Sequence, residues 1–258
     1  MQQITSTHNE RIAALRALSD KRERDRTGLF LVEGVKMVRE AAGCVRVETA
    51  LVDAEQAQAL APLTARLQEA GAQVLFAAPH VFRSVSDAKT PQGILAAVRM
   101  PAPGGRPKGA RLVALDGVQD PGNVGTIWRT ADAAGFGALL LGEGSADPLS
   151  PKVLRAAMGS GFRLPFGRAE PLGEALDALS ARGYSIIASA LDGDDFYRRP
   201  DPGRRIALIV GNEARGIRPE ILARADYRLK LPMRGGAESL NAAVAAGIFM
   251  YDLMNARQ

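Results

Sequence analysis

The amino-acid sequence predicts an α/β protein of two domains, the second of which contains a parallel sheet. The chain has 258 residues, of which 47% are hydrophobic, enough for more than one core. Three prolines and three glycines occur within Met100–Gly109, a composition that blocks regular structure and marks a linker. Apolar runs alternate with amphipathic segments on both sides of it, as strands alternate with helices. We therefore expect domains at 1–99 and 110–258, joined by a linker at 100–109.

The sequence of residues 1–99 predicts a small α/β domain. Ile12, Leu15 and Leu18 repeat at helical spacing, so a helix is expected over 10–19, followed by a charged turn at 20–26. Beyond this point short apolar runs alternate with longer segments of helical periodicity. The expected strands are 30–32, 45–52, 73–76 and 93–98, and the expected helices are 34–42 and 55–70.

The strands after the linker are apolar on both faces, which indicates a buried parallel sheet with helices on each side. A very apolar final helix is expected from Leu240 to Met254. Ligands of such sheets bind at the carboxyl ends of the strands, so the residues that follow each strand are the candidates for a site. The expected strands are 112–115, 138–141, 185–190, 206–210 and 228–231.

The charge of the chain suggests an anionic partner. Lys and Arg total 33 and Asp and Glu total 28, which gives a net charge of +5. Two segments, 99–111 and 148–169, contain no acidic residue, although a solvated surface is the alternative interpretation of such runs. Their basic residues are Arg99, Arg106, Lys108, Arg111, Lys152, Arg155, Arg163 and Arg168.

The cysteine and histidine content excludes several kinds of site. Cys44 is the only cysteine, so no intramolecular disulfide and no zinc site of several thiolates can form. His8 and His80 are the only histidines and lie far apart, so no metal centre is expected. The first residues lack the pattern of a signal peptide, and no apolar run is long enough to span a membrane. A cytoplasmic protein without a membrane partner is therefore expected.

The first candidate site follows the strand at 112–115. A glycine-rich turn leads into a helix that is expected to end at Gly135 and to bury Ile127. Arg129 lies about 200° around the helix from Ile127, so it points away from the buried face. There, together with Asn123, it is placed to hold a phosphate or a carboxylate. An ordinary surface arginine is the alternative.

Two further polar turns follow the strands at 206–210 and 228–231. Gly211-Asn212-Glu213 comes directly after the first of these strands, and glycine allows a ligand to approach the backbone closely. Ser239 and Asn241 stand at the start of the final helix, where Ser239 is expected to be the N-cap and the free N–H groups of the first turn can face a ligand. A capped core helix is the alternative for this last motif.

Other nucleotide-binding and hydrolytic patterns are not met. Gly142-Glu-Gly144 lacks the later glycine of a dinucleotide fingerprint, and no glycine-rich loop ends in Gly-Lys-Ser or Gly-Lys-Thr. Gly159-Ser-Gly161 has the wrong spacing for a nucleophile elbow. A dehydrogenase and a P-loop enzyme are therefore disfavoured.

Taken in chain order, the three motifs resemble those of the SpoU (TrmH-like) family of RNA 2′-O-ribose methyltransferases, in the SPOUT superfamily. The first is Asn123-x-Gly125-x-x-x-Arg129-x-Ala131, the second Gly211-Asn212-Glu213-x-x-Gly216, and the third Leu231-Pro232 with Ser239-Leu240-Asn241. Residues 110–258 carry the resemblance. Residues 21–98, around Gly28-Leu-Phe-Leu-Val-Glu-Gly34, are similar to the L30e-like substrate-binding domain of that family.

The resemblance implies a fold, a cofactor and a set of site residues. The catalytic half would be a trefoil-knotted parallel sheet that binds S-adenosylmethionine, without a metal. Carried over by position, the resemblance assigns cofactor binding to Gly211, Leu231 and Leu240. The residues that it assigns to the reacting centre are Asn123, Arg129, Glu213, Ser239 and Asn241.

The resemblance also implies partners. Members of this type act as homodimers in which the motif arginine, here Arg129, reaches a site shared with the partner chain. The two-domain build favours 23S ribosomal RNA as the substrate. A transfer-RNA 2′-O-methyltransferase and a non-enzymatic RNA-binding or ribosome-assembly protein with a vestigial site remain as alternatives. Trp128, Phe162 and Phe166 are candidates to stack on an RNA base, although core positions are the favoured interpretation.

Overall fold

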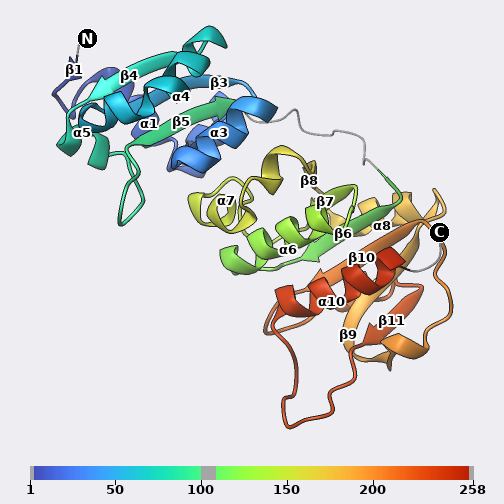
Figure 1. The fold of residues 1–258 in the computed structure, drawn as a ribbon. Coiled ribbons are helices and arrows are strands. Elements are labelled where there is room, and N and C mark those ends of the chain that lie inside the picture. Colours follow the sequence, from blue (N-terminus) through green and yellow to red (C-terminus); the bar gives the residue numbers. More distant parts are fainter. Residues whose placement is uncertain (1–2, 100–108, 256–258) are drawn as a thin grey trace. The chain divides into compact units, whose positions relative to one another are not determined.

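A computed structural model of the chain describes residues 3–99 and 109–255 (Figure 1). The chain divides into two compact units. One holds Met1–Pro101 together with Leu149–Leu154, and the other holds Ala102–Pro148 and Arg155–Gln258. Residues 100–108, and with them most of the expected linker, lie outside the described residues.

The amino-terminal unit contains a mixed five-stranded sheet. Its strands are β1 (Gln3–Ile4), β2 (Leu29–Glu33), β3 (Val47–Asp53), β4 (Gln73–Ala77) and β5 (Ile94–Arg99). They lie in the order β1-β4-β3-β5-β2, with β5 antiparallel to both of its neighbours and the other pairs parallel. The four strands expected from the sequence are confirmed within a few residues, and the prediction missed the two-residue strand β1.

Helices α1 and α5 bury their apolar side chains against this sheet. Ile12 and Leu15 of α1 and Phe82 of α5 belong to one core cluster with Leu51 of β3 and Leu75 of β4. The helices of the unit are α1 (Glu10–Ala17), α2 (Lys21–Thr27), α3 (Val35–Cys44), α4 (Ala57–Glu69) and α5 (Pro79–Arg83).

The segment expected as a charged turn at 20–26 is helix α2, so that prediction is wrong. Asp20 caps the helix by accepting a backbone N–H at 2.8 Å, and Gly28 ends it with a left-handed φ of 66°. Lys21 and Asp25 form an ion pair at 2.8 Å on its exposed side. The apolar periodicity that reveals most helices is absent here, because charged residues make up nearly the whole segment.

The carboxyl-terminal unit contains a six-stranded sheet in which every neighbouring pair is parallel. Its strands are β6 (Arg111–Asp116), β7 (Ala138–Leu141), β8 (Phe166–Arg168), β9 (Ser185–Asp195), β10 (Ile206–Gly211) and β11 (Tyr227–Lys230). Their order is β11-β9-β10-β6-β7-β8. The expected parallel sheet and its five expected strands are confirmed. The prediction missed β8, which has only three residues.

Helices cover both faces of this sheet (Figure 1). They are α6 (Pro121–Ala133), α8 (Leu172–Ser180), α9 (Pro219–Leu222) and α10 (Ala242–Asn255). The remaining helix, α7 (Pro151–Ala157), begins in the segment that groups with the amino-terminal unit. Leu176 of α8 and Ile221 of α9 belong to a core cluster with Ala114 of β6 and Ile209 of β10. Helices α6 and α10 pack against each other, and a Cβ on Gly247 would lie 3.6 Å from the side chain of Thr130.

Side chains just before α6 and α10 determine where these two helices begin. Asp120 Oδ1 accepts the backbone N–H of Asn123 at 2.7 Å, and α6 stops before Gly135 as expected. Asn241 Oδ1 accepts the N–H of Ala243 at 2.9 Å, so Asn241 caps α10. The expectation that Ser239 is the N-cap and that the helix starts at Leu240 is wrong. An amide side chain directly before the helix reaches the first free N–H groups, whereas Ser239 lies in the exposed loop before it.

Acidic side chains from outside the segment at 148–169 neutralise part of its charge. Arg163 pairs with Asp132 at 2.8 Å, and Arg168 pairs with Asp147 at 2.9 Å. A scan along the sequence cannot see these partners because the fold brings them together. In the segment at 99–111, Arg106 and Lys108 lie outside the described residues.

Trp128 is a core residue, as favoured from the sequence. Its side chain is fully buried, its Nε1 donates to the carbonyl of Leu164 at 3.1 Å, and its ring meets that of Phe166 edge-on. Across residues 3–99 and 109–255, no helix is both long and apolar enough to cross a membrane. The same part of the chain holds no group of three or more His, Cys, Asp or Glu side chains arranged to bind a metal ion.

Candidate active site

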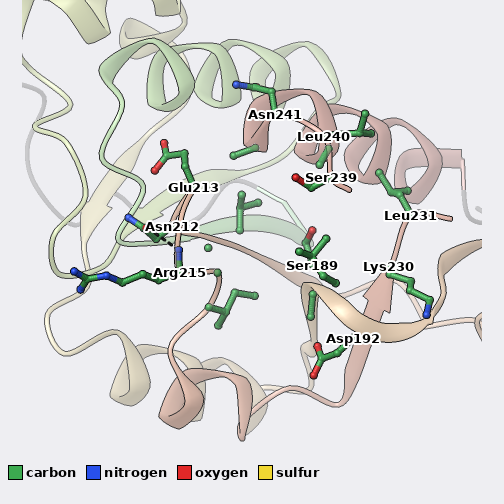
Figure 2. A pocket seen from close by; sticks show the side chains of 18 of the residues that line it. Ser189, Asp192, Asn212, Glu213, Arg215, Lys230, Leu231, Ser239, Leu240 and Asn241 are labelled. Atoms are coloured by element: carbon green, nitrogen blue, oxygen red, sulfur yellow. Dashed lines mark hydrogen bonds between the residues drawn. The ribbon is translucent and has the colours of Figure 1, made fainter. Parts of the chain in front are cut away.

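The carboxyl ends of β9, β10 and β11, together with the start of α10, enclose an open cavity of about 660 Å³ (Figure 2). This is the sheet edge at which parallel α/β proteins bind ligands, and the volume is typical of a small-molecule site. Most lining residues belong to four segments: Ser189–Asp192 within β9, Val210–Ile217 at the end of β10 and beyond it, Lys230, Leu231 and Met233 at the end of β11 and beyond it, and Ser239–Ala242 at the start of α10.

Three motifs that are distant in the sequence are joined by side-chain hydrogen bonds at one wall of this cavity. Asn123 of α6 donates through Nδ2 to Glu213 Oε1 at 2.9 Å. The same amide accepts through Oδ1 from Asn241 Nδ2, also at 2.9 Å. Because Asn241 also caps α10, the side-chain amides of Asn123 and Asn241 each have one orientation that satisfies every partner. The structure thus brings together Asn123, Glu213 and Asn241 as the sequence predicted.

Glu213 is held in its ionised form. Partial burial raises the pKa of its carboxyl group. Hydrogen bonds from the Asn123 side chain and from backbone N–H groups together lower the pKa by more than burial raises it, so the pKa lies below its ordinary value. The backbone donors include Gln119 and Asp120, both at 3.2 Å. The carboxylate therefore links the loop after β10 to the loop after β6, and it acts only as an acceptor near neutral pH.

The turn after β10 is compact enough to exclude any side chain at its first position. A Cβ on Gly211 would lie 2.4 Å from the backbone of both Gly216 and Ile217. Asn212 and Gly216 exchange two backbone hydrogen bonds of 2.9 Å, which close the turn. Asn212 Nδ2 also donates to the carbonyl of Gly117 at 2.8 Å. Glycine at 211 is therefore required by close backbone packing within the turn.

The other walls of the cavity are largely apolar. Leu231 and Leu240 line it together with Phe249 of α10, and Leu240 is 38% exposed at the mouth. Ser239 lies on the rim and is exposed. Gly211, Leu231 and Leu240, the three expected cofactor contacts, thus all line one cavity, which also includes Glu213, Ser239 and Asn241.

Arg129 and Asn123 are the expected site residues that do not line this cavity, and among the described residues Arg129 is not bonded to a lining residue as Asn123 is. Arg129 is exposed on α6, on the side away from the buried Ile127, as the helical spacing predicted. Within residues 3–99 and 109–255, its guanidinium forms no ion pair. A free guanidinium on a helix that also carries Asn123 is available to bind an anion.

Sequence reasoning missed the wall formed by the middle of β9. The pairing of β9 with β11 jumps from Ala188 to Asp194, so the residues between them leave the ladder. Ser189 and Asp192 from this excursion line the cavity. The predicted strand ends at 190, so Asp192 lies outside it. The rule that sites lie beyond the carboxyl ends of parallel strands would have pointed to this segment.

Two family profiles match the chain, one for each unit. The SpoU rRNA Methylase family matches residues 110–251, and the MRM3-like substrate binding domain matches residues 9–96. The first match spans the parallel sheet, the cavity and all three motifs. The second spans the mixed sheet of the amino-terminal unit apart from β1 and the end of β5.

Relatives that are similar over the full length include proteins acting on ribosomal RNA. The chain is 39% identical to the Bacillus subtilis 23S rRNA (guanosine(2553)-2′-O)-methyltransferase RlmP, over 98% of this chain and 99% of that protein. An AdoMet-bound rRNA methyltransferase from Sinorhizobium meliloti has a TM-score of 0.86 and 32% identity, over 98% of this chain and 97% of that one. The SpoU methyltransferase AviRb from Streptomyces viridochromogenes, in complex with AdoMet, has a TM-score of 0.84 and 29% identity, over 96% and 98%.

Proposed function

The chain belongs to the SpoU rRNA Methylase family, and we propose that it transfers a methyl group from S-adenosylmethionine to a ribose 2′-hydroxyl of 23S ribosomal RNA. One observation carries the proposal. Asn123 joins Glu213 to Asn241 beside a cavity of ligand size, although the three residues come from distant parts of the chain. Such a set of mutually oriented polar groups next to an apolar pocket is typical of a catalytic site.

The residues of the cavity fit S-adenosylmethionine. Adenine needs a flat apolar slot, and the cavity offers Leu231, Leu240 and Phe249 for that purpose. Gly211, whose lack of a side chain lets the turn close tightly, lines the same cavity. When bound, the cofactor supplies a methyl group on a positively charged sulfur. We assign Gly211, Leu231 and Leu240 to its binding.

The polar wall is suited to orienting groups rather than to removing a proton. The ribose hydroxyl has to lose its proton and to lie in line with the methyl–sulfur bond. Glu213 has a lowered pKa and already accepts three hydrogen bonds, so it is a poor base. We assign to Glu213 and Asn241 the task of orienting Asn123, and to Ser239 that of supporting the substrate at the rim.

Arg129 is our candidate for the group that acts on the 2′-oxygen. Its guanidinium is exposed, and no acid within the described residues pairs with it. A guanidinium gives up its proton only with difficulty, which makes it a difficult base but a strong donor to an oxyanion or a phosphate. We therefore give Arg129 two duties: it grips the RNA phosphate next to the target ribose, and it either accepts the hydroxyl proton or stabilises the negative charge on the oxygen.

We propose that the enzyme is a homodimer formed through α6 and α10. These two helices pack side by side, and α10 exposes Val244 and Tyr251 at 52% and 48%. Exposed apolar side chains on one helix support an interface, and in a two-fold dimer the same surface serves both subunits. In this arrangement Arg129, which lies outside the cavity of its own chain, reaches the cavity of the partner.

We also propose that the sheet is knotted. The strand order supports this, because β10 lies between β9 and β6 although it follows both in the sequence. From β11 at one edge, the chain returns through the loop at 231–241 to α10, which contacts β10 near the middle of the sheet. Threading of this carboxyl-terminal segment is an exception to the rule that chains avoid knots.

The amino-terminal unit is our candidate for the RNA-binding module. Its match to a substrate binding domain and the activity named for the Bacillus subtilis relative support 23S rRNA as the target. We place the boundary between the RNA-binding and methyltransferase domains at 100–109, and we place the enzyme in the cytoplasm with its substrate.

Two measurements test the proposed function. Calorimetric titration with S-adenosylmethionine should show binding to the purified protein, and ribosomal RNA from cells that lack the gene should lose one 2′-O-methyl group. The guanosine named for the Bacillus subtilis relative is the first position to map. Restoration of the methyl group by the wild-type gene, but not by R129A, would support the assignment.

Three outcomes would overturn parts of the proposal. Absence of cofactor binding would leave a non-enzymatic RNA-binding protein. Loss of a ribose methyl group from transfer RNA, with 23S rRNA unchanged, would replace the target. A lost methyl group that maps to a base nitrogen would replace the reaction.

A further inference from the structure

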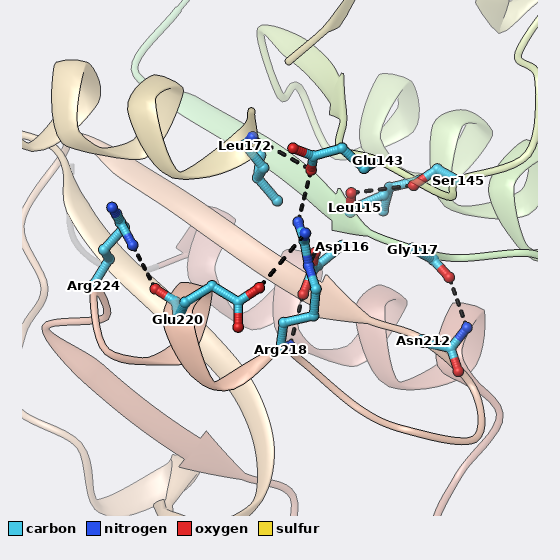
Figure 3. Close-up of polar contacts among 10 residues, drawn as sticks. All are labelled: Leu115, Asp116, Gly117, Glu143, Ser145, Leu172, Asn212, Arg218, Glu220 and Arg224. Atoms are coloured by element: carbon cyan, nitrogen blue, oxygen red, sulfur yellow. Dashed lines mark hydrogen bonds and ion pairs between the residues drawn. The ribbon is translucent and has the colours of Figure 1, made fainter. Parts of the chain in front are cut away.

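Arg218 lies where the loops after three parallel strands meet (Figure 3). Asp116, the last residue of β6, accepts the Nε–H of Arg218 through Oδ1 and the backbone N–H of Arg218 through Oδ2, both at 2.7 Å. The side chain of Asp116 has no exposed surface. A fully buried carboxylate needs such partners, because an unpaired buried charge is strongly unfavourable.

The same guanidinium reaches the loop after β7. Its Nη2 donates to Glu143 Oε2 at 2.7 Å, and Glu143 also accepts the backbone N–H of Leu172 at 3.4 Å. Burial opposes the charge of Arg218, but its hydrogen bonds to Glu143 and Asp116 raise its pKa above the ordinary value. Arg218 therefore stays charged and connects the chain segments that follow β6, β7 and β10.

This anchor stands at the end of the turn that forms one wall of the cavity. The residues from Gly211 to Ile217 line the cavity, and Arg218 is the next residue. The beginning of the turn is attached to the β6 loop by the bond from Asn212 to Gly117. Because the turn is tied to the β6 segment at both ends, a shift at Arg218 moves Ile217 and alters the cavity wall.

We propose that Arg218 is a positioning residue for the methyl-donor pocket, holding the turn from Gly211 to Ile217 against β6 through the buried Asp116. The inference rests on the proposed function, which supplies the ligand of that pocket. Arg218 does not line the cavity, so it acts through the turn. Arginine suits this task because its planar fork can serve two carboxylates at once, whereas lysine offers a point charge.

The test compares R218A and R218K with wild type by calorimetric titration with S-adenosylmethionine, below the unfolding temperature of each variant. R218A should weaken binding roughly tenfold or more, as expected when support for a site is lost, and R218K should fall between it and wild type. The Michaelis constant for RNA should stay unchanged. The Ile217 methyl signal in a carbon–proton NMR spectrum should shift in R218A.

Arg224 provides the matched control. It lies six residues further on and has similar side-chain exposure at 35% against 39%. It pairs with Asp177 at 2.9 Å and donates to the carbonyl of Glu220, and neither partner belongs to the turn from Gly211 to Ile217. R224A should bind the cofactor within about twofold of wild type, as most surface substitutions do. The D116N variant is an independent test. It removes the negative charge with which Arg218 pairs, so it should weaken cofactor binding, as R218A does.

The outcomes separate this inference from the proposed function. If wild type does not bind the cofactor, the proposed function fails. If wild type binds and R218A binds equally well with an unmoved Ile217 signal, the positioning role is wrong. Should R218A not fold, R218K decides: wild-type affinity in R218K would show that the fork is not needed and would overturn the inference.

Discussion

Asn123 and Glu213 lie 90 residues apart in the sequence, and a 2.9 Å hydrogen bond joins their side chains. Asn123 is 8% exposed, so both ends of its amide depend on protein partners. Glu213 accepts a hydrogen bond from Asn123 Nδ2, and Asn241 Nδ2 donates one to Asn123 Oδ1. The first and second motifs therefore act as one unit, and damage to either should disturb the other.

Replacing Asn123 with alanine should lower the methylation rate at least about tenfold and reduce stability by about 1–3 kcal/mol, because Glu213 and Asn241 lose a buried partner. Single-turnover kinetics and denaturant unfolding measure the two effects. Asn255→Ala is the control, since the side chain of Asn255 donates to the carbonyl of Tyr251 at the exposed end of α10. An N123A protein with unchanged turnover would contradict the assigned role.

The lowered pKa of Glu213 predicts a particular dependence of stability on pH. A carboxyl whose folded-state pKa lies below its ordinary 4.5 stabilises the fold above pH 4.5, and the contribution disappears as the pH falls through the folded-state value. Wild type should thus unfold at a higher temperature than E213Q at pH 7, and the difference should shrink below pH 4.5. Thermal unfolding at a series of pH values measures it.

Glu69→Gln is the control for this series, because Glu69 is exposed at the end of α4. The unfolding temperature of the Glu69→Gln variant should equal that of wild type at every pH. A difference between wild type and E213Q that stays constant or grows towards acid would refute the prediction for Glu213.

Gly211→Ala should remove cofactor binding and destabilise the protein. The new Cβ would lie 2.4 Å from the backbone of Gly216, and overpacking of this kind costs about 1–3 kcal/mol. The control is Gly43→Ala, where nothing lies within 4 Å and the residue is in helix α3. That change should stabilise the protein by about 0.5–1 kcal/mol, because alanine is the better helix former. Wild-type cofactor affinity in G211A would show that the turn has more room than the structure indicates.

Arg129→Ala should abolish methylation while leaving stability unchanged, because its exposed side chain contributes little to packing. Arg66→Ala, at another exposed helical position, should leave both properties as in wild type. A large loss of stability in R129A, or normal turnover in either R129A or R129K, would contradict a special guanidinium role.

Mixing two inactive variants tests whether the site is shared between subunits. In a dimer of R129A with E213Q, one site receives Arg129 from one chain and Glu213 from the other, so it is intact. After random exchange of subunits, about a quarter of wild-type activity should return, since half of the dimers are mixed and each has one good site. No recovery, despite subunit exchange observed by fluorescence energy transfer, would place Arg129 in its own chain's site.

The parallel sheet could be predicted because its strands are short, apolar on both faces and separated by helices. Helix α2 could not, because its stability comes from caps and ion pairs rather than an apolar stripe. For the same reason, the ion pairs of the basic segment at 148–169 could not be predicted from the sequence. Arg163 appears unopposed along the sequence and meets Asp132 only after folding.

The site residues that belong to short sequence motifs could be predicted. Glycines and polar residues after strands indicated Gly211, Glu213 and Asn241. Which hydrogen-bond partners these residues have depends on side-chain geometry. Neither the two hydrogen bonds of Asn123 nor the capping of α10 by Asn241 could therefore be predicted from the spacing of residues in the sequence. Arg218 was missed because its partner Asp116 lies in a different motif, 102 residues away.

Strand β10 also sets the time at which the enzyme becomes competent. Along the sheet order, β9 and β11 on one side and β6, β7 and β8 on the other are connected only through β10. A chain leaving the ribosome has made β6 to β9 before Ile206–Gly211 is available to join them. Until that strand enters the sheet, the cavity lacks the turn after β10, and β11 and α10, which supply other walls of the cavity, follow β10 in the chain. The nascent protein therefore has no pocket for a methyl donor, and newly made chains can start to modify RNA only after their last segment has folded.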